Sequence, residues 1–472
     1  MRCSMFSRLL TVVAVITLTA LVPAEARGAG TRTAPAQSAA RPNASQEDAV
    51  RALESVPVVK PKVKAAAVKT ATPPTAVGGV ELAKVQGSIT FYTNRADLVA
   101  DGTFTKLEAQ FKKLYPKVTA VKVIAFSDYA AGVRPLMESG DYGDLLLILP
   151  SVKKSEYGNY YAPLNALYGP EQLYFYERWS HQGLNYGISV GVTAEGLIYN
   201  KKVLQQAKVK VPLQSASQWL EALKKIKGQG LTPMYLNAGA RWPLQQWDKY
   251  PLVLSGSTQL YERMLNENKP FSGPTPVHRA LEVMHKLVTG KLVEQDLSAN
   301  CYESSQKDLL RGDAGMLYLG SWALPELLSR SAHPEDLGFM PVPGEDGASL
   351  RGQLWHDWAY AVSCRSHNQE TAKAFLKFLL EHLEGDSRGF IPTLKSRAAT
   401  LPQLTEYLSY SPQLLETPEF SEHFSAVSRR AKIDFYQGGY LQALLRAKNF
   451  TAALQKLDER WAQARSGAAQ PQ

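Results

Sequence analysis

Aromatic and polar side chains gather at the predicted carboxyl ends of strands, where they could bind a small polar ligand. An apolar run over 314–319 ends in Gly320-Ser321-Trp322, a corner that opens a new helical segment. Small ligands bind at the carboxyl ends of strands in α/β sheets. An indole there offers a flat face for stacking and one N–H donor. We therefore predict that Trp322 contacts ligand, and packing in the core is the alternative.

Two more tryptophans, Trp242 and Trp247, occur in a proline-containing segment that follows Asn237. They are five positions apart, and a continuous α-helix would not place them on one face. Indoles on a loop above a sheet favour a ligand platform. We assign Asn237, Trp242 and Trp247 to the site, and core packing is the alternative for both tryptophans.

The sequence Trp355-His356-Asp357-Trp358 comes directly before an apolar strand predicted over 359–363. Side chains of an extended chain alternate between its two faces, so Trp355 and Asp357 should face one way and His356 and Trp358 the other. We predict that Trp355 and Asp357 line the pocket and that Trp358 packs in the core.

Polar residues that suit the hydroxyl groups of a ligand follow the first predicted strand, over 88–93. Arg95 carries a rigid fork of donors, while Asn94 and Asp97 can accept hydroxyl hydrogens. The alternative is a turn with a helix cap. Glu303 could also accept from a hydroxyl, although its place in the first turn of a predicted helix could serve only the helix dipole.

The sequence contains little that indicates a catalytic site or a metal site. Gly187-Ile188-Ser189-Val190-Gly191 matches the Gly-x-Ser-x-Gly pattern of serine hydrolases, which requires a strand, a sharp turn and a helix. Residues 192–199 instead predict more strand. His278 and His285 are seven apart, no cysteine pair has zinc-site spacing, and no phosphate-cradling loop appears. We predict no catalytic residue, no metal and no cofactor.

The N-terminal segments predict export. Residues 1–26 have a basic start, an apolar stretch and a small-x-small site at Ala24-Glu25-Ala26, typical of a secretory signal peptide. An uncleaved anchor, which would tether the protein, is the alternative. Residues 27–85 are rich in Ala, Pro and Lys and predict a disordered tether. After cleavage, Cys301 and Cys364 would be the remaining cysteines, and their pairing in an oxidising compartment is left open.

Composition predicts a globular protein of two or three lobes. The chain has 472 residues, of which 45% are hydrophobic and 20% are charged. The net charge is +10, but residues 87–472 contain no basic run and no recognisable nucleic-acid module, so no nucleic-acid partner is expected.

Periodicity predicts an α/β organisation. Strands over 88–93, 118–126 and 144–149 alternate with helices over 104–114 and 128–139, which is the βαβαβ opening of a doubly wound lobe. A second pattern begins after residue 200, with a helix from about 217, a strand over 234–236 and a strand over 336–343. A helix over 370–380 and a helical stretch over 418–465 complete the chain.

Five short sequences carry a resemblance to a known family. They are Tyr92-Thr93-Asn94-Arg95-Ala96-Asp97-Leu98, Ser139-Gly140-Asp141-Tyr142-Gly143-Asp144, Arg241-Trp242-Pro243-Leu244-Gln245-Gln246-Trp247, Glu303-Ser304-Ser305 and Leu319-Gly320-Ser321-Trp322-Ala323. In this order and spacing, the chain from Ser88 to about Arg397 resembles type II periplasmic binding proteins of carbohydrate ABC importers, which are distantly similar to the maltose-binding protein.

The resemblance implies an α/β fold of two lobes, with a ligand cleft between them and a hinge of several crossings. It places lobe 1 at 86–199 and 341–392, and lobe 2 at 200–340 and 393–466. It implies a periplasmic or extracytoplasmic monomer that binds a mono- or oligosaccharide and delivers it to the transmembrane subunits of an ABC permease. The alternatives are a sensor that presents sugar to a membrane histidine kinase and, further off, a secreted glycoside-cleaving enzyme.

The chain departs from the family in two respects. Cys301-Tyr302 stands where many relatives have Asp-Trp before the Glu-Ser-Ser, which would alter ligand contacts or reserve Cys301 for a disulfide. The apolar stretch is not followed by a lipid-anchor cysteine, which favours a free periplasmic form or an unusual tether.

Overall fold

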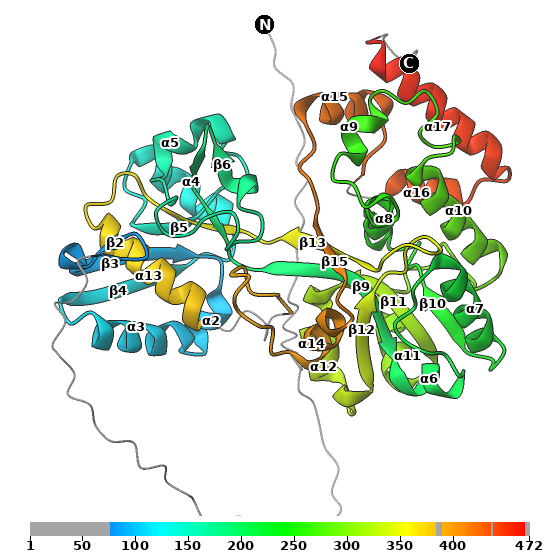
Figure 1. The fold of residues 1–472 in the computed structure, drawn as a ribbon, viewed down its shortest axis with the longest axis horizontal. Coiled ribbons are helices and arrows are strands. Elements are labelled where there is room, and N and C mark those ends of the chain that lie inside the picture. Colours follow the sequence, from blue (N-terminus) through cyan, green and yellow to red (C-terminus); the bar gives the residue numbers. More distant parts are fainter. Residues whose placement is uncertain (1–75, 384–388, 436–437, 468–472) are drawn as a thin grey trace, which may run out of the picture. The chain divides into compact units, whose positions relative to one another are not determined.

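The computed structural model describes residues 76–383, 389–435 and 438–467 (Figure 1). The predicted signal peptide and the predicted tether up to residue 75 lie outside the described residues. Within the described ranges, no helix combines the length and the apolar character needed to cross a membrane.

The first of two large sheets has the strand order β4-β3-β5-β14-β8. Its strands are β3 (Gly87–Thr93), β4 (Val118–Ala125), β5 (Leu145–Leu147), β8 (Ile188–Ser189) and β14 (Ala359–Val362). β3 is parallel to β4 and β5, and β14 is antiparallel to β5. All three residues of β5 are buried, as expected for a central strand covered on both faces. The predicted βαβαβ opening is confirmed.

Helices cover this sheet: α2 (Ala96–Ala100), α3 (Thr103–Leu114), α4 (Tyr129–Ser139) and α13 (Gln369–His382). The apolar residues that predicted α3 are buried, except Leu114, which is 60% exposed at its last position. Phe375 of α13 meets Phe111 of α3, with ring centroids 5.1 Å apart. Figure 1 shows α3 and α13 beside the strands that they cover.

Between β5 and β8 the chain makes an excursion with little regular structure. It contains η2 (Lys154–Glu156), α5 (Tyr157–Tyr160), η3 (Glu177–Trp179), β6 (Ser180–His181) and β7 (Leu184–Asn185). Tyr157 and Trp179 pack against the core of the first sheet. We call the first sheet, its helices and this excursion the first lobe.

The second sheet has the strand order β10-β11-β9-β13-β15, and β12 also pairs with β9. Its strands are β9 (Val192–Asn200), β10 (Thr232–Tyr235), β11 (Ala314–Gly320), β12 (Leu337–Pro341), β13 (Arg351–His356) and β15 (Gln413–Glu416). β9 and β11 are buried at every position, which explains their long apolar runs.

Helices surround the second sheet and form most of the C-terminal part; with the sheet, we call them the second lobe. They are α6 (Lys201–Gln206), α7 (Ala216–Lys227), α8 (Gln245–Ser255), α9 (Leu260–Met264), α10 (Pro276–Thr289), α11 (Tyr302–Arg311), α12 (Leu324–Arg330), α14 (Pro402–Ser409), α15 (Glu422–Ala431), α16 (Gly439–Leu445) and α17 (Phe450–Arg465). Trp461 of α17 is fully buried and its Nε1 donates to the Met264 carbonyl at 3.0 Å, so the predicted C-terminal core is confirmed.

The segment before β3 differs from the prediction. The tether was expected to reach residue 85, but β1 (Ala76–Val77), β2 (Val80–Glu81) and η1 (Leu82–Lys84) are formed, and Val80 and Val85 are buried in the first core. The Glu81 amide donates to Glu370 of α13 at 2.8 Å. The two apolar side chains account for the difference, because they fill a surface of α13 that would otherwise be exposed.

The chain passes between the sheets at several adjacent places. β8 leads into β9 through Val190 and Gly191, and β13 leads into β14 through Asp357 and Trp358. These passages are hydrogen-bonded, since the Asp357 amide donates to the Gly191 carbonyl at 3.0 Å and the Val190 amide to the Trp358 carbonyl at 2.7 Å. Ile391 bonds to β9 in the same region.

Sheet membership assigns some segments differently from the predicted lobes. β9 and β13 belong to the second sheet, although 192–199 and 351–356 fall within the predicted first lobe. The predicted boundary after residue 199 falls inside β9, and the one before residue 341 falls inside β12, whereas the chain changes sheet at the passages. The limits of the lobes as moving bodies stay a prediction.

Candidate functional site

The ends of the strands meet at one edge of each sheet. In the first sheet β3 and β5 end where β14 begins, because β3 and β5 are parallel and β14 is antiparallel to β5. In the second sheet β10, β11 and β13 end where β9 begins, because β9 is antiparallel to β11 and β13. The passages between the sheets leave from these same edges.

A cavity of about 1010 Å³ opens there, lined by both lobes. The first lobe contributes most of residues 148–157 together with Arg178, Trp179 and His181. The second lobe contributes Glu262, Trp355, His356 and residues 419–422. Its aromatic side chains are those of Tyr157, Trp179, Trp355, Trp358 and Phe420. Such a volume suits a ligand of a few rings, and aromatic walls with scattered polar groups are typical of ligand pockets.

Glu419 joins the two lobes at the cavity wall. Its carboxylate lies 2.6 Å from Lys154 Nζ and 2.6 Å from Arg178 Nη1. Both cations belong to the first lobe, whereas Glu419 follows β15 of the second sheet. None of these three residues was predicted from the sequence, because ion pairs between residues this far apart leave no pattern in it.

Trp355 and His356 form one wall of the cavity. Their rings stack 5.0 Å apart at 20°, and His356 also meets the edges of Trp179 and Phe175. Burial and the Arg178 guanidinium lower the pKa of His356 to about 4, so its ring is neutral near pH 7. Its Nδ1 hydrogen is assigned as the donor to the Asp357 carbonyl at 2.9 Å.

The predicted alternation along 355–358 is only partly right. Trp355, Asp357, His356 and Trp358 all line the cavity. β13 ends at His356 and β14 begins at Ala359, so 357–358 are not strand and strict alternation does not apply to them. Trp358 does pack against the first core, with its ring 5.4 Å from Tyr129.

A second aromatic cluster follows β10 and β11. The rings of Trp242 and Trp322 lie 5.8 Å apart, and Tyr302 meets Trp242 at 4.9 Å. All three are partly buried against the core of the second lobe. Tyr302 thus adds a third aromatic ring to this cluster.

Trp247 was wrongly placed on a loop. It lies on α8, is 2% exposed and stacks on Trp219 at 5.8 Å and 9° in the second core. Pro243 suggested a loop. It lies instead in the 3-10 turn that leads into α8, where a proline is tolerated because it comes before the helix interior. Asn237 is likewise only 1% exposed.

Most of the polar residues predicted to bind ligand do not line the cavity. Asn94 and Arg95 follow β3 at the expected edge, but Arg95 Nε donates to Asp97 at 2.7 Å, and this pair lowers the pKa of Asp97. None of the three is among the residues that line the cavity. Glu303, in the first turn of α11, is 71% exposed and lies 3.7 Å from Arg330.

Ser189 cannot act as a hydrolase nucleophile. It is fully buried on β8, its hydroxyl accepts from Trp179 Nε1 at 2.9 Å, and strand β9 follows where a nucleophile would need a helix. Cys301 and Cys364, whose pairing was left open, are both free. Cys301 precedes α11 of the second lobe and Cys364 follows β14 of the first.

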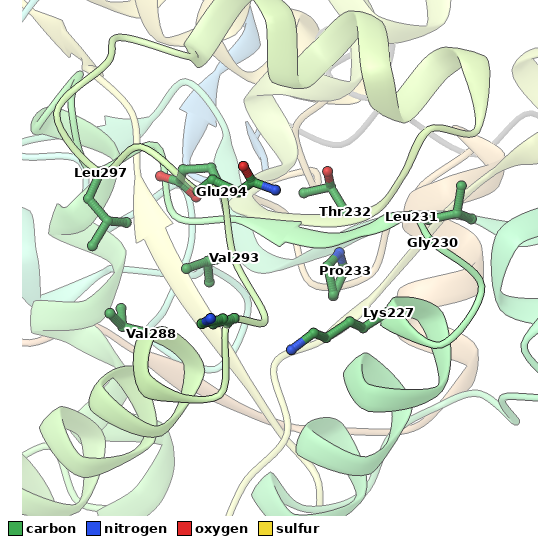
Figure 2. A pocket seen from close by; sticks show the side chains of 11 residues that line it. Lys227, Gly230, Leu231, Thr232, Pro233, Val288, Val293, Glu294 and Leu297 are labelled. Atoms are coloured by element: carbon green, nitrogen blue, oxygen red, sulfur yellow. The ribbon is translucent and has the colours of Figure 1, made fainter.

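Another cavity, of about 620 Å³, lies at the amino end of β10 (Figure 2). Glu294 lines it and accepts from the Leu236 and Ala238 amides at 2.8 and 3.0 Å. Figure 2 shows Lys227 reaching along it from α7. This cavity shares no lining residue with the cavity between the lobes.

The sequence is similar to those of several known proteins. Residues 95–382 match the family model described as bacterial extracellular solute-binding protein. A probable sugar-binding periplasmic protein of Brucella suis is 29% identical over 152 residues, which cover 32% of this chain and 35% of that protein. An ABC transporter extracellular-binding protein of Pyrococcus horikoshii is 23% identical over 257 residues, 51% of this chain and 57% of its own. The chain thus spans about half the length, or less, of these curated relatives.

Solved structures show the same fold. A binding protein of an ABC transporter from Bifidobacterium animalis subsp. lactis, solved with mannobiose, has a TM-score of 0.64 at 23% identity, covering 84% of this chain and 99% of that one. RafE from Streptococcus pneumoniae, in its apo form, has a TM-score of 0.66 at 16% identity, covering 81% and 98%. The predicted two-lobed fold is confirmed.

Proposed function

Because the chain belongs to the bacterial extracellular solute-binding protein family, we propose that it binds an oligosaccharide outside the cytoplasm and delivers it to an ABC permease. The observation that carries this proposal is the cavity of about 1010 Å³ between the lobes, with Trp355, Trp358 and Trp179 in its walls. Indoles stack on the apolar faces of sugars, and a neutral imidazole such as His356 adds a polar group without a charge.

The proposed contacts divide between two groups. Trp355 and Asp357 contact the sugar in the cavity, and Trp242 and Trp322 extend the platform along the second lobe. Asn94 and Arg95 meet it from the first lobe once the lobes close. Among structurally similar proteins, RafE has been solved with raffinose and the Bifidobacterium protein with mannobiose, so sugars of two to three rings are the first to test.

The passages through Gly191, Asp357 and Ile391 would act as the hinge. A ligand that touches both lobes favours the closed arrangement. Export by a cleaved signal peptide and a monomeric state belong to the same proposal, and tethering by an uncleaved signal segment is the alternative to cleavage. Ligand saturation should reduce the radius of gyration in solution scattering, whereas an unchanged curve at proven saturation would indicate a preformed site.

Titration calorimetry with mannobiose, mannotriose, raffinose and chitin oligosaccharides tests the function directly. Trp355→Ala should weaken the tightest of these by about 1–3 kcal/mol, roughly 5- to 150-fold, as expected for a central aromatic anchor. Phe450→Ala is the control, since Phe450 is a partly buried aromatic residue at the start of α17, away from the cavity. Failure of all four sugars to bind the natural chain would refute the oligosaccharide assignment.

A further inference from the structure

A buried ion pair lies behind the aromatic walls of the site. Lys249, on α8, places its ammonium 3.6 Å from Glu195, on β9, and the two side chains are 9% and 2% exposed. Neither residue was predicted from the sequence, because the two lie 54 positions apart and become neighbours only in the folded chain. Burying two opposite charges costs several kcal/mol of desolvation for each ion, which their attraction offsets only in part.

Lys249 contacts one of the indoles that line the cavity. Its ammonium lies over the Trp355 ring, 4.4 Å from the centroid. A cation over an indole face is attracted by the negative face of the ring, and more strongly when it is desolvated. The same ammonium therefore joins Glu195 to Trp355.

Glu195 lies next to the other predicted platform. It pairs in register with Gly320, the residue before Ser321-Trp322. A Cβ atom at Gly320 would lie 2.3 Å from Trp322 Nε1 and 3.2 Å from Glu195 Oε2. The Trp322 indole edge and the Glu195 carboxylate thus both approach the backbone at Gly320. Any side chain at this position would collide with the indole, so glycine is needed here.

The carboxylate is not fully satisfied. Among the described residues, Glu195 Oε2 is buried without a hydrogen-bond partner. Burial raises the pKa of Glu195, and the Lys249 ammonium opposes that rise. A buried pair with an unsatisfied oxygen is a poor source of stability, since well-packed apolar residues in its place are often neutral or stabilising. Stability alone therefore does not explain why this ion pair is present.

We propose that Glu195 and Lys249 are positioning residues for sugar binding. Lys249 holds the Trp355 indole, and Glu195 holds Lys249 and borders the Trp322 edge. The pair thereby sets the relative positions of the two platforms without touching the sugar. The expected effect on sugar affinity rests on the proposed function. The expected effect on the positions of the indoles does not, because it can be measured without ligand.

The test uses the full chain labelled with 5-fluorotryptophan, with the Trp322 and Trp355 signals assigned from Trp322→Phe and Trp355→Phe. Lys249→Met should shift and broaden the ¹⁹F signal of Trp355, and Lys249→Arg, which keeps a cation, should restore it. Glu195→Leu combined with Lys249→Met should shift both signals while keeping the melting temperature close to that of the natural chain. Unmoved signals in the Lys249→Met and double variants would overturn the proposal.

Calorimetry with mannotriose measures the consequence. The double variant should bind at least tenfold more weakly than the natural chain, and Lys249→Arg should bind within a factor of about three of it. Lys202→Met, which removes a surface ion pair with Asp336, is the matched control and should leave both affinity and spectrum unchanged. Equal affinity in the double variant would also overturn the proposal. If mannotriose fails to bind the natural chain, the sugar assignment is wrong, and the fluorine spectra still decide the positioning role.

Discussion

His356 should make the stability of this protein depend on pH in a defined window. Its ring is enclosed by Trp355, Trp179 and Phe175, and burial together with Arg178 lowers its pKa from 6.5 to about 4. Between these two values the unfolded chain binds a proton that the folded chain excludes. Folding stability from this group is therefore complete above pH 6.5, falls as the pH drops to 4 and changes no further below that.

The size of the effect follows from the difference between the two pKa values. At about 1.4 kcal/mol for each pH unit, His356 contributes at most about 3.5 kcal/mol that is lost between pH 6.5 and 4. Urea denaturation at pH 7, 6, 5 and 4 would measure it. His356→Gln removes the titrating group and should flatten the acid decline by that amount.

The comparison needs an exposed histidine as its control. His333 lies in the second lobe with 65% of its side chain exposed, so His333→Gln should follow the natural chain. The reasoning is refuted if the natural chain and His356→Gln lose equal stability between pH 7 and 4, because the decline would then arise from carboxylates alone.

Three further changes probe other parts of the molecule. Glu419→Gln removes both ion pairs between the lobes and should cost about 1 kcal/mol in denaturation at low salt, with the difference vanishing in 1 M salt; a salt-independent loss would contradict an electrostatic contact. A chain that begins at Val85 should be about 1–3 kcal/mol less stable than one that begins at Ala76, since Val80 is buried, and equal melting curves would show that the segment does not dock. Trp247→Ala should cost about 3–5 kcal/mol of stability while the folded fraction keeps its sugar affinity, and a stable variant with lost affinity would return Trp247 to the site.

Regular elements were accessible from the sequence because their signals are local. The spacing of Phe104, Leu107 and Phe111 predicted α3, and the apolar run at 144–149 predicted β5. The tryptophans were harder, since an indole serves both cores and ligand sites. Trp247 proved to be core, whereas Trp355 lines the cavity, and only tertiary packing separates the two outcomes.

The cavity wall supplied by the first lobe was not accessible from the sequence. Trp179 and Arg178 come from η3, a single 3-10 turn within a long irregular excursion, and no periodicity marks them. Glu419 lies in the irregular segment that follows β15. The sequence did not predict β15. These residues become neighbours only when the two lobes are assembled, so each one alone resembles an ordinary surface residue.

The placement of Trp355 and Asp357 connects recognition with motion. Trp355 is the last residue but one of β13 in the second sheet, and Asp357 belongs to the passage that leads into the first. The Asp357 amide is hydrogen-bonded to the neighbouring passage at Gly191. A sugar that contacts these two side chains therefore acts on the backbone about which the lobes would turn. Ligands that contact only Trp242 and Trp322, in the second aromatic cluster, do not touch this backbone and should bind without closing the lobes.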